Sequence, residues 1–291
     1  MKHVFVSPHP DDIALSCGGL VARLRDRGEE VAIATIFCGA GKRDRLTRYQ
    51  QRALGFDREA DERGEPEPTD PADANADAPD SAPTPEQVMA VRRAEDEAYA
   101  RSAGASIAFV KMPDGVFRGY VGGAQLMAVP REDDPAPVEE LRATLAGLAP
   151  DRLYIPFAVG GHVDHRQTRR AAVALLVEDA SPYLERAAFY EDFPYAMWAG
   201  FERLDQLDPE ILPSLPAGVS LTPEYVEIED LLDRKIENLR AYDSQIGHLF
   251  RTDGESLAGA IRANTARVGS LGGVGPAERY WRVTTNNPSA E

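Results

Sequence analysis

The sequence predicts a Rossmann-like α/β fold, in which a mostly parallel sheet is flanked by helices. Apolar and β-branched residues at 4–6 stop at Ser7, and an apolar pattern with helical spacing follows at about 15–27. Residues 31–37 (VAIATIF) then form a continuous apolar run that is typical of a buried strand. A strand, a helix and a strand in this order predict a βαβ unit with a right-handed crossover.

The alternation of strands and helices continues along the chain. Thr84 and Pro85 fit the N-cap and first position of a helix that Gly104 ends. We expect further strands at 106–110, 152–155, 187–190 and within 277–285, further helices at about 137–148, 167–178 and 228–244, and an irregular region at 193–216. In such a sheet, ligand sites lie at the carboxyl ends of the strands.

Composition limits the classes of protein to consider. The 291 residues and 43% hydrophobic content fit one domain over 1–291 with a sizeable core. No apolar run is long enough to cross a bilayer, and the first residues lack the pattern of a secretory signal, so we expect a cytoplasmic protein. The net charge of −16 argues against nucleic acid and anionic membranes as partners.

Two other features of the composition have local consequences. Cys17 and Cys38 are too few for a disulfide framework, and we expect both to be reduced and packed near the sheet. Residues 57–83 are rich in Asp, Glu, Pro and Ala and offer almost nothing to bury. This acidic segment is therefore predicted to be a mobile loop.

A first polar cluster, Ser7-Pro8-His9-Pro10-Asp11-Asp12, lies at the turn between the first strand and helix. The two prolines fix φ and stiffen the turn. A three-residue spacing lets His9 and Asp12 point the same way, and imidazole with carboxylate suits zinc. The alternative is an ordinary helix start, with Asp11 and Asp12 as N-cap and first-turn acids.

A second cluster, Gly160-Gly161-His162-Val163-Asp164-His165, follows the predicted strand at 152–155 and also leads into a helix. His162 and His165 repeat the three-residue spacing, and Asp164 is a candidate acceptor for an imidazole N–H. His3 and His248 lack such neighbours and are expected to be ordinary histidines. A dinucleotide site is not indicated, because the first turn lacks Gly-x-Gly-x-x-Gly.

These paired motifs resemble those of the PIG-L (LmbE-like) zinc-dependent N-deacetylases. Further matches cover most of the chain outside the acidic segment: Arg92-Arg93-Ala-Glu95, Pro113-Asp114-Gly115, Tyr190-Glu191-Asp192-x-Pro194-Tyr195, and Lys235 with Tyr242-x-Ser244-Gln245. The sequence departs from the family at Ile13, where many members have Glu, and at Gly160, where members that act on thiol precursors can have Tyr. A mycothiol-type substrate is therefore not favoured.

The resemblance implies a role for each of eight residues. Zn²⁺, or another divalent metal such as Fe²⁺, would be held by His9, Asp12 and His165. Asp11 would be the general base. His162 would assist at the oxyanion or the leaving group with Asp164 orienting it, and Arg92 and Asp114 would bind substrate.

The implied reaction removes an acetyl group from a small N-acetylated amino sugar or sugar conjugate of the N-acetylglucosamine type. Three protein ligands leave one position open on zinc, where water can be activated. Two alternatives remain: an amidohydrolase for a different acyl group, and a non-catalytic metal or sugar binding protein. The oligomeric state stays open, a homo-oligomer included.

Overall fold

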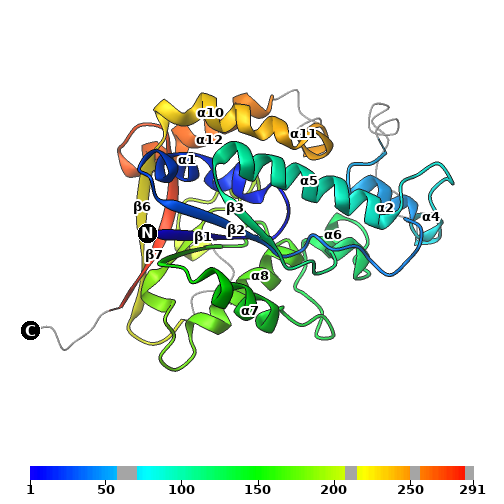
Figure 1. The fold of residues 1–291 in the computed structure, drawn as a ribbon, viewed down its shortest axis with the longest axis horizontal. Coiled ribbons are helices and arrows are strands. Elements are labelled where there is room, and N and C mark those ends of the chain that lie inside the picture. The colour runs from blue at the N-terminus through cyan, green and yellow to red at the C-terminus, as the bar shows by residue number, and fades with distance from the viewer. Residues whose placement is uncertain (58–70, 207–214, 250–255, 286–291) are drawn as a thin grey trace, which may run out of the picture.

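A computed structural model describes residues 1–57, 71–206, 215–249 and 256–285 (Figure 1). Its centre is a seven-stranded sheet with the order β3-β2-β1-β4-β5-β7-β6. From β3 to β5 in this order the neighbours are parallel, whereas β7 pairs antiparallel with β5 and β6. The strands are Lys2–Ser7 (β1), Glu30–Thr35 (β2), Ser106–Phe109 (β3), Arg152–Pro156 (β4), Ala187–Tyr190 (β5), Val219–Glu227 (β6) and Ala277–Thr285 (β7). The predicted fold class is confirmed.

Helices cover both faces of the sheet (Figure 1). Helices α1, α5, α10 and α12 contribute to the core on one face, and α7 and α8 to the core on the other. Their bounds, with those of the shorter helices, are Asp12–Asp26 (α1), Arg48–Ala53 (α2), Pro71–Asn75 (α4), Pro85–Ala103 (α5), Gly123–Leu126 (α6), Val138–Leu148 (α7), Val163–Leu176 (α8), Tyr195–Trp198 (α9), Leu232–Asn238 (α10), Asp243–Leu249 (α11) and Leu257–Gly272 (α12).

Strand β1 separates the two cores. Val4 and Val6 pack in the core of α7 and α8, whereas Phe5 between them packs in the core that contains α1. This alternation follows because successive side chains of a strand point to opposite faces. Both faces of β1 are therefore apolar, as expected for a central strand of a parallel sheet.

A third, smaller core lies beside the sheet around α2 and α4, and it corrects the prediction for 57–83. Residues 58–70 lie outside the described residues. Part of the remainder is helix α4, and Ala74 and Ala78 are buried in the third core. Residues 71–83 therefore bury more than their composition indicated, because small alanines suffice to pack there, whereas the mobility of the segment stays a prediction.

The helix expected at 228–244 is interrupted. Tyr242, with φ −103° and ψ 55°, leaves the helical region between α10 and α11 and donates its hydroxyl hydrogen bond to Asp96 at 2.6 Å. This tertiary contact overrides the local helical pattern. Strand β6 was not predicted, since Pro223 breaks its pattern; proline is tolerated there because β6 is an edge strand.

Two expectations from composition can be compared with the described residues. Cys17 and Cys38 are both free and buried, and Cys17 packs in the α1 core as predicted. None of the described helices is both long enough and apolar enough to span a membrane.

Candidate metal centre and active site

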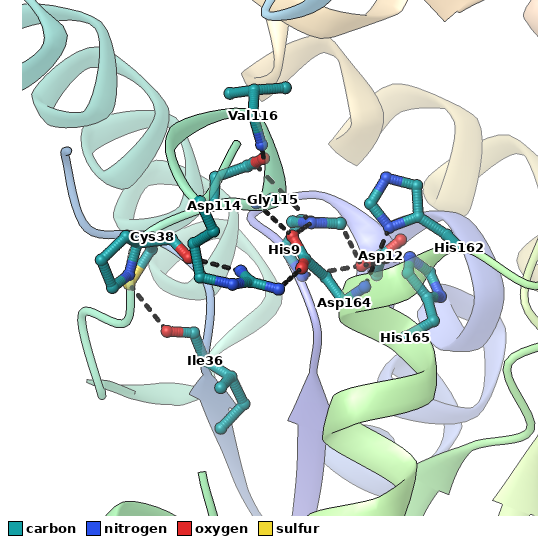
Figure 2. A network of polar contacts seen from close by, with 12 residues as sticks. His9, Asp12, Ile36, Cys38, Asp114, Gly115, Val116, His162, Asp164 and His165 are labelled. Carbon is teal, nitrogen blue, oxygen red and sulfur yellow. Dashed lines mark hydrogen bonds and ion pairs between the residues drawn. The ribbon is translucent and has the colours of Figure 1, made fainter. Parts of the chain in front are cut away.

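The two histidine and aspartate clusters meet at the carboxyl edge of the sheet, as predicted. His9 and Asp12 belong to the turn between β1 and α1, while His162 and His165 belong to the start of α8 after β4. Because β1 and β4 are adjacent and parallel, both turns open on the same edge. Figure 2 shows the side chains of these four residues gathered in one place. All four are buried.

The turn before α1 has an unusual backbone at Asp11. Its φ is 104°, outside the ordinary regions for an L-residue, and such strain costs about 1–3 kcal/mol. Asp11 occupies the N-cap position, but its side chain makes no capping hydrogen bond. The interpretation of Asp11 as a helix cap is therefore wrong. The turn is held instead by His9 N, which donates to Asp12 Oδ2 at 2.7 Å.

His165 has one ring nitrogen held by a carboxylate and the other without a partner. Its Nδ1 lies 2.7 Å from Asp192 Oδ1, and an ionised carboxylate only accepts, so Nδ1 carries the hydrogen. Its Nε2 is buried and has no hydrogen-bond partner among the described residues. A carboxylate behind one nitrogen and a free lone pair on the other are characteristic of a metal-binding histidine.

His9 has the same arrangement with the nitrogens exchanged. Its Nε2 lies 2.8 Å from Asp164 Oδ2, which leaves Nδ1 directed towards Asp12. Burial acts to lower the pKa of His9, but Asp12, Asp164 and Asp114 raise it well above the usual value. The carboxylates therefore make this position favourable for a positive charge.

Asp12 lies close to both of these imidazoles. Its Oδ2 lies 3.5 Å from His9 Nδ1 and 3.4 Å from His165 Nε2. Tetrahedral zinc with bonds of about 2.0–2.1 Å would separate its ligand atoms by about 3.4 Å. Both separations agree with this value. Burial opposes ionisation of Asp12, yet His165 and His9 hold its pKa at about 2. Among the described residues, the groups whose possible ligand atoms all lie within 4.8 Å of one another are His9 with His162 and His165, and His9 with Asp114 and Asp164. The predicted donor set of His9, Asp12 and His165 therefore stays a prediction.

His162 lies beside this donor set but is oriented differently. Its Nδ1 accepts the backbone N–H of Asp164 at 3.2 Å, so His162 is the N-cap of α8. Burial and the neighbouring His9 lower the pKa of His162 well below its usual value. The ring is thus neutral, and with Nδ1 as acceptor its hydrogen is on Nε2.

The contacts of Asp164 differ from the expectation. The resemblance implied that Asp164 orients His162, but its carboxylate contacts His9 Nε2, Gly115 N at 2.8 Å and Arg118. Figure 2 shows Asp164 close to His9. The imidazole acceptor predicted from the sequence is present, but it serves His9, because Asp164 lies in the first turn of α8 and points back towards β1.

Asp11, Arg92 and Asp114 form a second group of charges next to the donor set. Arg92 Nη1 lies 3.3 Å from Asp114 Oδ2, and Nη2 lies 3.9 Å from Asp11 Oδ2. Burial and the charge of Asp12 raise the pKa of Asp11 well above its usual value, against the opposing effect of Arg92. A carboxylate with a raised pKa next to a metal site is a candidate general base.

Six of these groups line one cavity of about 190 Å³: His9, Asp11, Asp12, Arg92, Asp114 and His162. His165 and Asp164 do not line this cavity. Its polar wall contains Asp11, Arg92 and His162. Its apolar and aromatic wall comes mainly from residues in or next to α2 and α6 and from the start of α9: Ala53, Leu54, Val116, Leu126, Met127, Pro194 and Tyr195. A few convergent polar groups in an otherwise apolar hollow are typical of a ligand site.

Comparison with known families identifies this arrangement. The family described as PIG-L: GlcNAc-PI de-N-acetylase matches residues 4–176, more than half of the chain. The chain belongs to this family. The matched segment contains both histidine motifs as well as Arg92 and Asp114, so the family resemblance stated from these residues is confirmed.

Relatives of this PIG-L member are deacetylases. A 2'-N-acetylparomamine deacetylase of Streptomyces fradiae is 29% identical over 305 residues, with 99% of this chain and 91% of the relative covered. Among solved structures, an antimicrobial reagent A40926 pseudoaglycone deacetylase has a TM-score of 0.67 at 22% identity, covering 99% of this chain and 98% of the other. The zinc inhibited form of a teicoplanin deacetylase has a TM-score of 0.69 at 21% identity, covering 99% and 100%. At these identities the two structures establish a shared fold.

Three residues of the candidate site were missed by sequence reasoning as site residues. Asp192 holds His165, Tyr195 lines the cavity with its ring centroid 5.2 Å from that of His165, and Arg118 contacts Asp164. Asp192 and Tyr195 belong to a motif already quoted for the resemblance, and their place just after a strand at the active edge was an available signal. Arg118 carries no such signal, because it lies in an irregular segment.

Proposed function

We propose that this protein is a metal-dependent N-deacetylase acting on an N-acetylglucosamine-like sugar or sugar conjugate. One observation carries the proposal. His9 and Asp12 line the cavity, and His165 Nε2 lies 3.4 Å from Asp12 Oδ2. Beside these candidate donors the cavity is also lined by Asp11, a carboxylate that is not needed as a ligand. A protein that only binds metal needs the donor set but has no use for this carboxylate.

Zn²⁺ or another divalent metal would be held by His9 Nδ1, Asp12 Oδ2 and His165 Nε2. When bound, such an ion supplies Lewis-acid polarisation of the amide carbonyl and lowers the pKa of water from about 15.7 towards about 7. Asp164 and Asp192, each hydrogen-bonded to the far nitrogen of a ligand imidazole, orient the donors.

Asp11 is proposed to move the proton. Its carboxylate accepts a proton from the attacking water and then delivers it to the nitrogen of the departing amine. The burial that raises its pKa brings it closer to the range in which one group can both take and release a proton near neutrality. The strained backbone at Asp11 keeps the carboxylate away from the helix N–H groups that would otherwise lower its pKa.

His162 and Arg92 complete the proposed machinery. Neutral His162, with its hydrogen on Nε2, donates to the carbonyl oxygen as negative charge develops there. The aspartate that follows it, Asp164, fixes this tautomer through its backbone N–H. Arg92 and Asp114 pair in the cavity wall and present donors and acceptors to sugar hydroxyl groups.

The substrate class follows from the relatives and the size of the cavity. At about 190 Å³, the cavity is smaller than the roughly 300–1,000 Å³ of sites that enclose drug-sized ligands. A cavity of this size can hold the acetamido group of one sugar ring, and the remainder of a conjugate would lie outside it. The S. fradiae relative is named for 2'-N-acetylparomamine, and the structural relatives are named for the A40926 pseudoaglycone and for teicoplanin. These names support a substrate of which only the acetylated part enters the cavity.

A panel of substrates tests the proposal. Purified protein with added zinc is incubated with N-acetylglucosamine, 2'-N-acetylparomamine and N-butanoylglucosamine, and the released amine is measured by fluorescence derivatisation, with Asp11→Asn as the control. We expect release from an acetylated substrate and much slower release from the butanoyl one. Faster butanoyl cleavage would favour the amidohydrolase alternative. Metal binding without amine release from any substrate would favour the non-catalytic alternative.

A further inference from the structure

Arg118 lies outside the cavity lining, yet it contacts the machinery from behind. It directly follows the short 3₁₀ helix Gly115–Phe117, and its side chain is 12% exposed. Its Nη2 donates to Asp164 Oδ1 at 2.6 Å, and its Nη1 donates to the Pro113 carbonyl at 2.6 Å. Its guanidinium also lies 4.5 Å from the centre of the Phe37 ring.

The other side of Arg118 is held by Asp134. Nε and Nη2 lie 2.9 and 3.0 Å from the two oxygens of Asp134, so this pair is bidentate. Tyr120 donates its hydroxyl hydrogen to the same carboxylate at 2.9 Å, and Gln167 of α8 donates to the Asp134 carbonyl. The guanidinium is therefore fixed from several directions, and its position is set by segments on both sides of it.

Asp164 transmits this position to the metal donors. It is fully buried, and its two oxygens have separate partners: Oδ1 accepts from Arg118, while Oδ2 accepts from His9 Nε2 and Gly115 N. Among the described residues, Arg118 is the arginine that pairs with this carboxylate. A buried carboxylate that loses its cation is strongly unfavourable unless it moves or takes up a proton.

From this geometry we infer that Arg118 is a positioning residue of the metal centre. It fixes the Asp164 carboxylate, and through that carboxylate it sets the orientation of the His9 imidazole and the direction of its Nδ1 lone pair. The inference rests on the proposed metal site but not on the reaction, since it concerns metal affinity. It also gives the segment from Arg118 to Asp134 a role in building the site.

The charge of Arg118 alone does not explain its contacts. Four hydrogen bonds to two carboxylates and a carbonyl use the planar fork of the guanidinium, which a lysine ammonium cannot reproduce. Arg118→Lys therefore keeps the charge and loses the geometry. Arg118→Met loses both and keeps much of the side-chain volume.

The test measures metal affinity by competition with a chromophoric zinc chelator at pH 7. We expect Arg118→Lys and Arg118→Met to weaken zinc binding by about tenfold or more, at the lower end of the effect of lost outer partners of metal ligands. The matched control is Arg142→Met, because Arg142 makes exposed pairs with Glu139 and Glu178 on α7 and after α8. Its zinc affinity should equal that of the wild type.

A double-mutant cycle separates positioning from general stability. If Arg118 acts through Asp164, Arg118→Met should change zinc affinity little in a chain that already carries Asp164→Asn. Circular dichroism melting identifies the fraction of each variant that is folded, and Asp134→Asn, which loosens only the outer contact, replaces any Arg118 variant that does not fold. Wild-type zinc affinity in folded Arg118→Lys and Arg118→Met would overturn the inference. Absence of zinc binding by the wild type would instead overturn the proposed metal site, and the inference with it.

Discussion

Two buried polar clusters contact helix α1, and they differ in how completely their hydrogen bonds are satisfied. The donor cluster, His9, Asp12 and His165, lies at the N-terminal end of α1. The lysine cluster, Lys235, Glu278 and Tyr280, lies further along the same helix, where Glu278 accepts from the N–H groups of Gly19 and Leu20.

Every oxygen of the lysine cluster's carboxylate is used. Glu278 Oε1 accepts from Gly19 N at 2.8 Å and Lys235 Nζ at 2.7 Å, and Oε2 accepts from Leu20 N and Tyr280 Oη, each at 2.8 Å. In the donor cluster, by contrast, His165 Nε2 has no partner. A cluster whose members satisfy one another holds a fold together. His3 Nε2 is also buried without a partner, so it is the position of His165 Nε2, 3.4 Å from Asp12 Oδ2, that indicates a ligand site.

The largest expected effect comes from the orphaned atom itself. His165→Ala removes one of three donors, so metal content should fall from about one ion per chain to a small fraction of that, and deacetylation should become undetectable. Elemental analysis of protein purified without added metal measures the first, and amine release measures the second.

The matched control is His3→Ala. His3 is also a buried histidine, but it stacks on Tyr154 with its ring centroid 5.9 Å away and does not belong to the site. It should lose stability and keep its metal. Full metal retention by His165→Ala would remove His165 from the donor set and with it the contrast between the clusters.

The next largest effect is expected on kcat when Asp11, the carboxylate beside the proposed metal donors, is replaced. Asp11→Asn is nearly isosteric, and Asn tolerates positive φ as Asp does, but its amide cannot take a proton near neutral pH. General base catalysis typically contributes about 10²–10⁴-fold, so kcat should fall by about that factor with KM little changed. Stopped and continuous amine assays at saturating zinc measure both constants.

Asp12→Asn is the comparison for this variant. It weakens a donor, so metal affinity and activity should fall together, whereas Asp11→Asn should keep its zinc. Near-normal turnover by Asp11→Asn at saturating zinc would contradict the proposed mechanism.

A smaller effect on metal affinity is expected from Asp192, the carboxylate that is hydrogen-bonded to His165. Asp192→Asn leaves the shape of the site intact but weakens the hydrogen bond to His165 Nδ1, and loss of such an outer partner typically costs about 10–100-fold in metal affinity. Chelator competition measures this change. The neighbouring Glu191→Gln is the control, because Glu191 is directed away from the site to Arg279 and Trp281. Equal metal affinities for the two variants would show that Asp192 does not support the donor.

These residues also show how far sequence reasoning reaches. His9, Asp12 and His165 could be predicted to converge, because parallel strands bring their carboxyl ends to one edge and three-residue spacing aligns side chains at a helix start. The sequence could not show whether Glu191 or Asp192 contacts His165. The side chains of adjacent residues after a strand point in opposite directions, and only tertiary packing decides which carboxylate lies next to His165.

Long-range contacts account for the other differences. The Arg118–Asp164 pair joins residues that are 46 positions apart, and no local pattern encodes it. The interruption of the helix expected at 228–244 likewise depends on Tyr242 reaching Asp96, 146 positions away. Local spacing therefore predicts which groups reach the edge of the sheet, whereas the partners that orient them depend on the completed fold.

The last prediction concerns the lysine cluster and is the smallest in its effect on the site. Glu278→Gln keeps the side-chain size but leaves Lys235, which is buried, without an anionic partner. Breaking a buried pair on one side typically costs about 3–5 kcal/mol of the free energy of unfolding. Zinc affinity and kcat of the folded variant should nevertheless match the wild type, because within the described part of the chain the hydrogen bonds of Glu278 go to Gly19, Leu20, Lys235 and Tyr280, outside the donor cluster.

Adding Lys235→Met to Glu278→Gln should recover part of the lost stability, because the unpaired buried charge is then removed. Urea unfolding of the two single variants and the double variant measures this coupling, and zinc titration of the same samples measures the site. If Glu278→Gln lowered zinc affinity while its unfolding free energy stayed unchanged, the lysine cluster would be part of the site. The degree of hydrogen-bond satisfaction would then no longer distinguish the two clusters on α1. Loss of stability alone, with full coupling between Lys235 and Glu278, is the result expected of a cluster whose polar groups already have their partners within the protein.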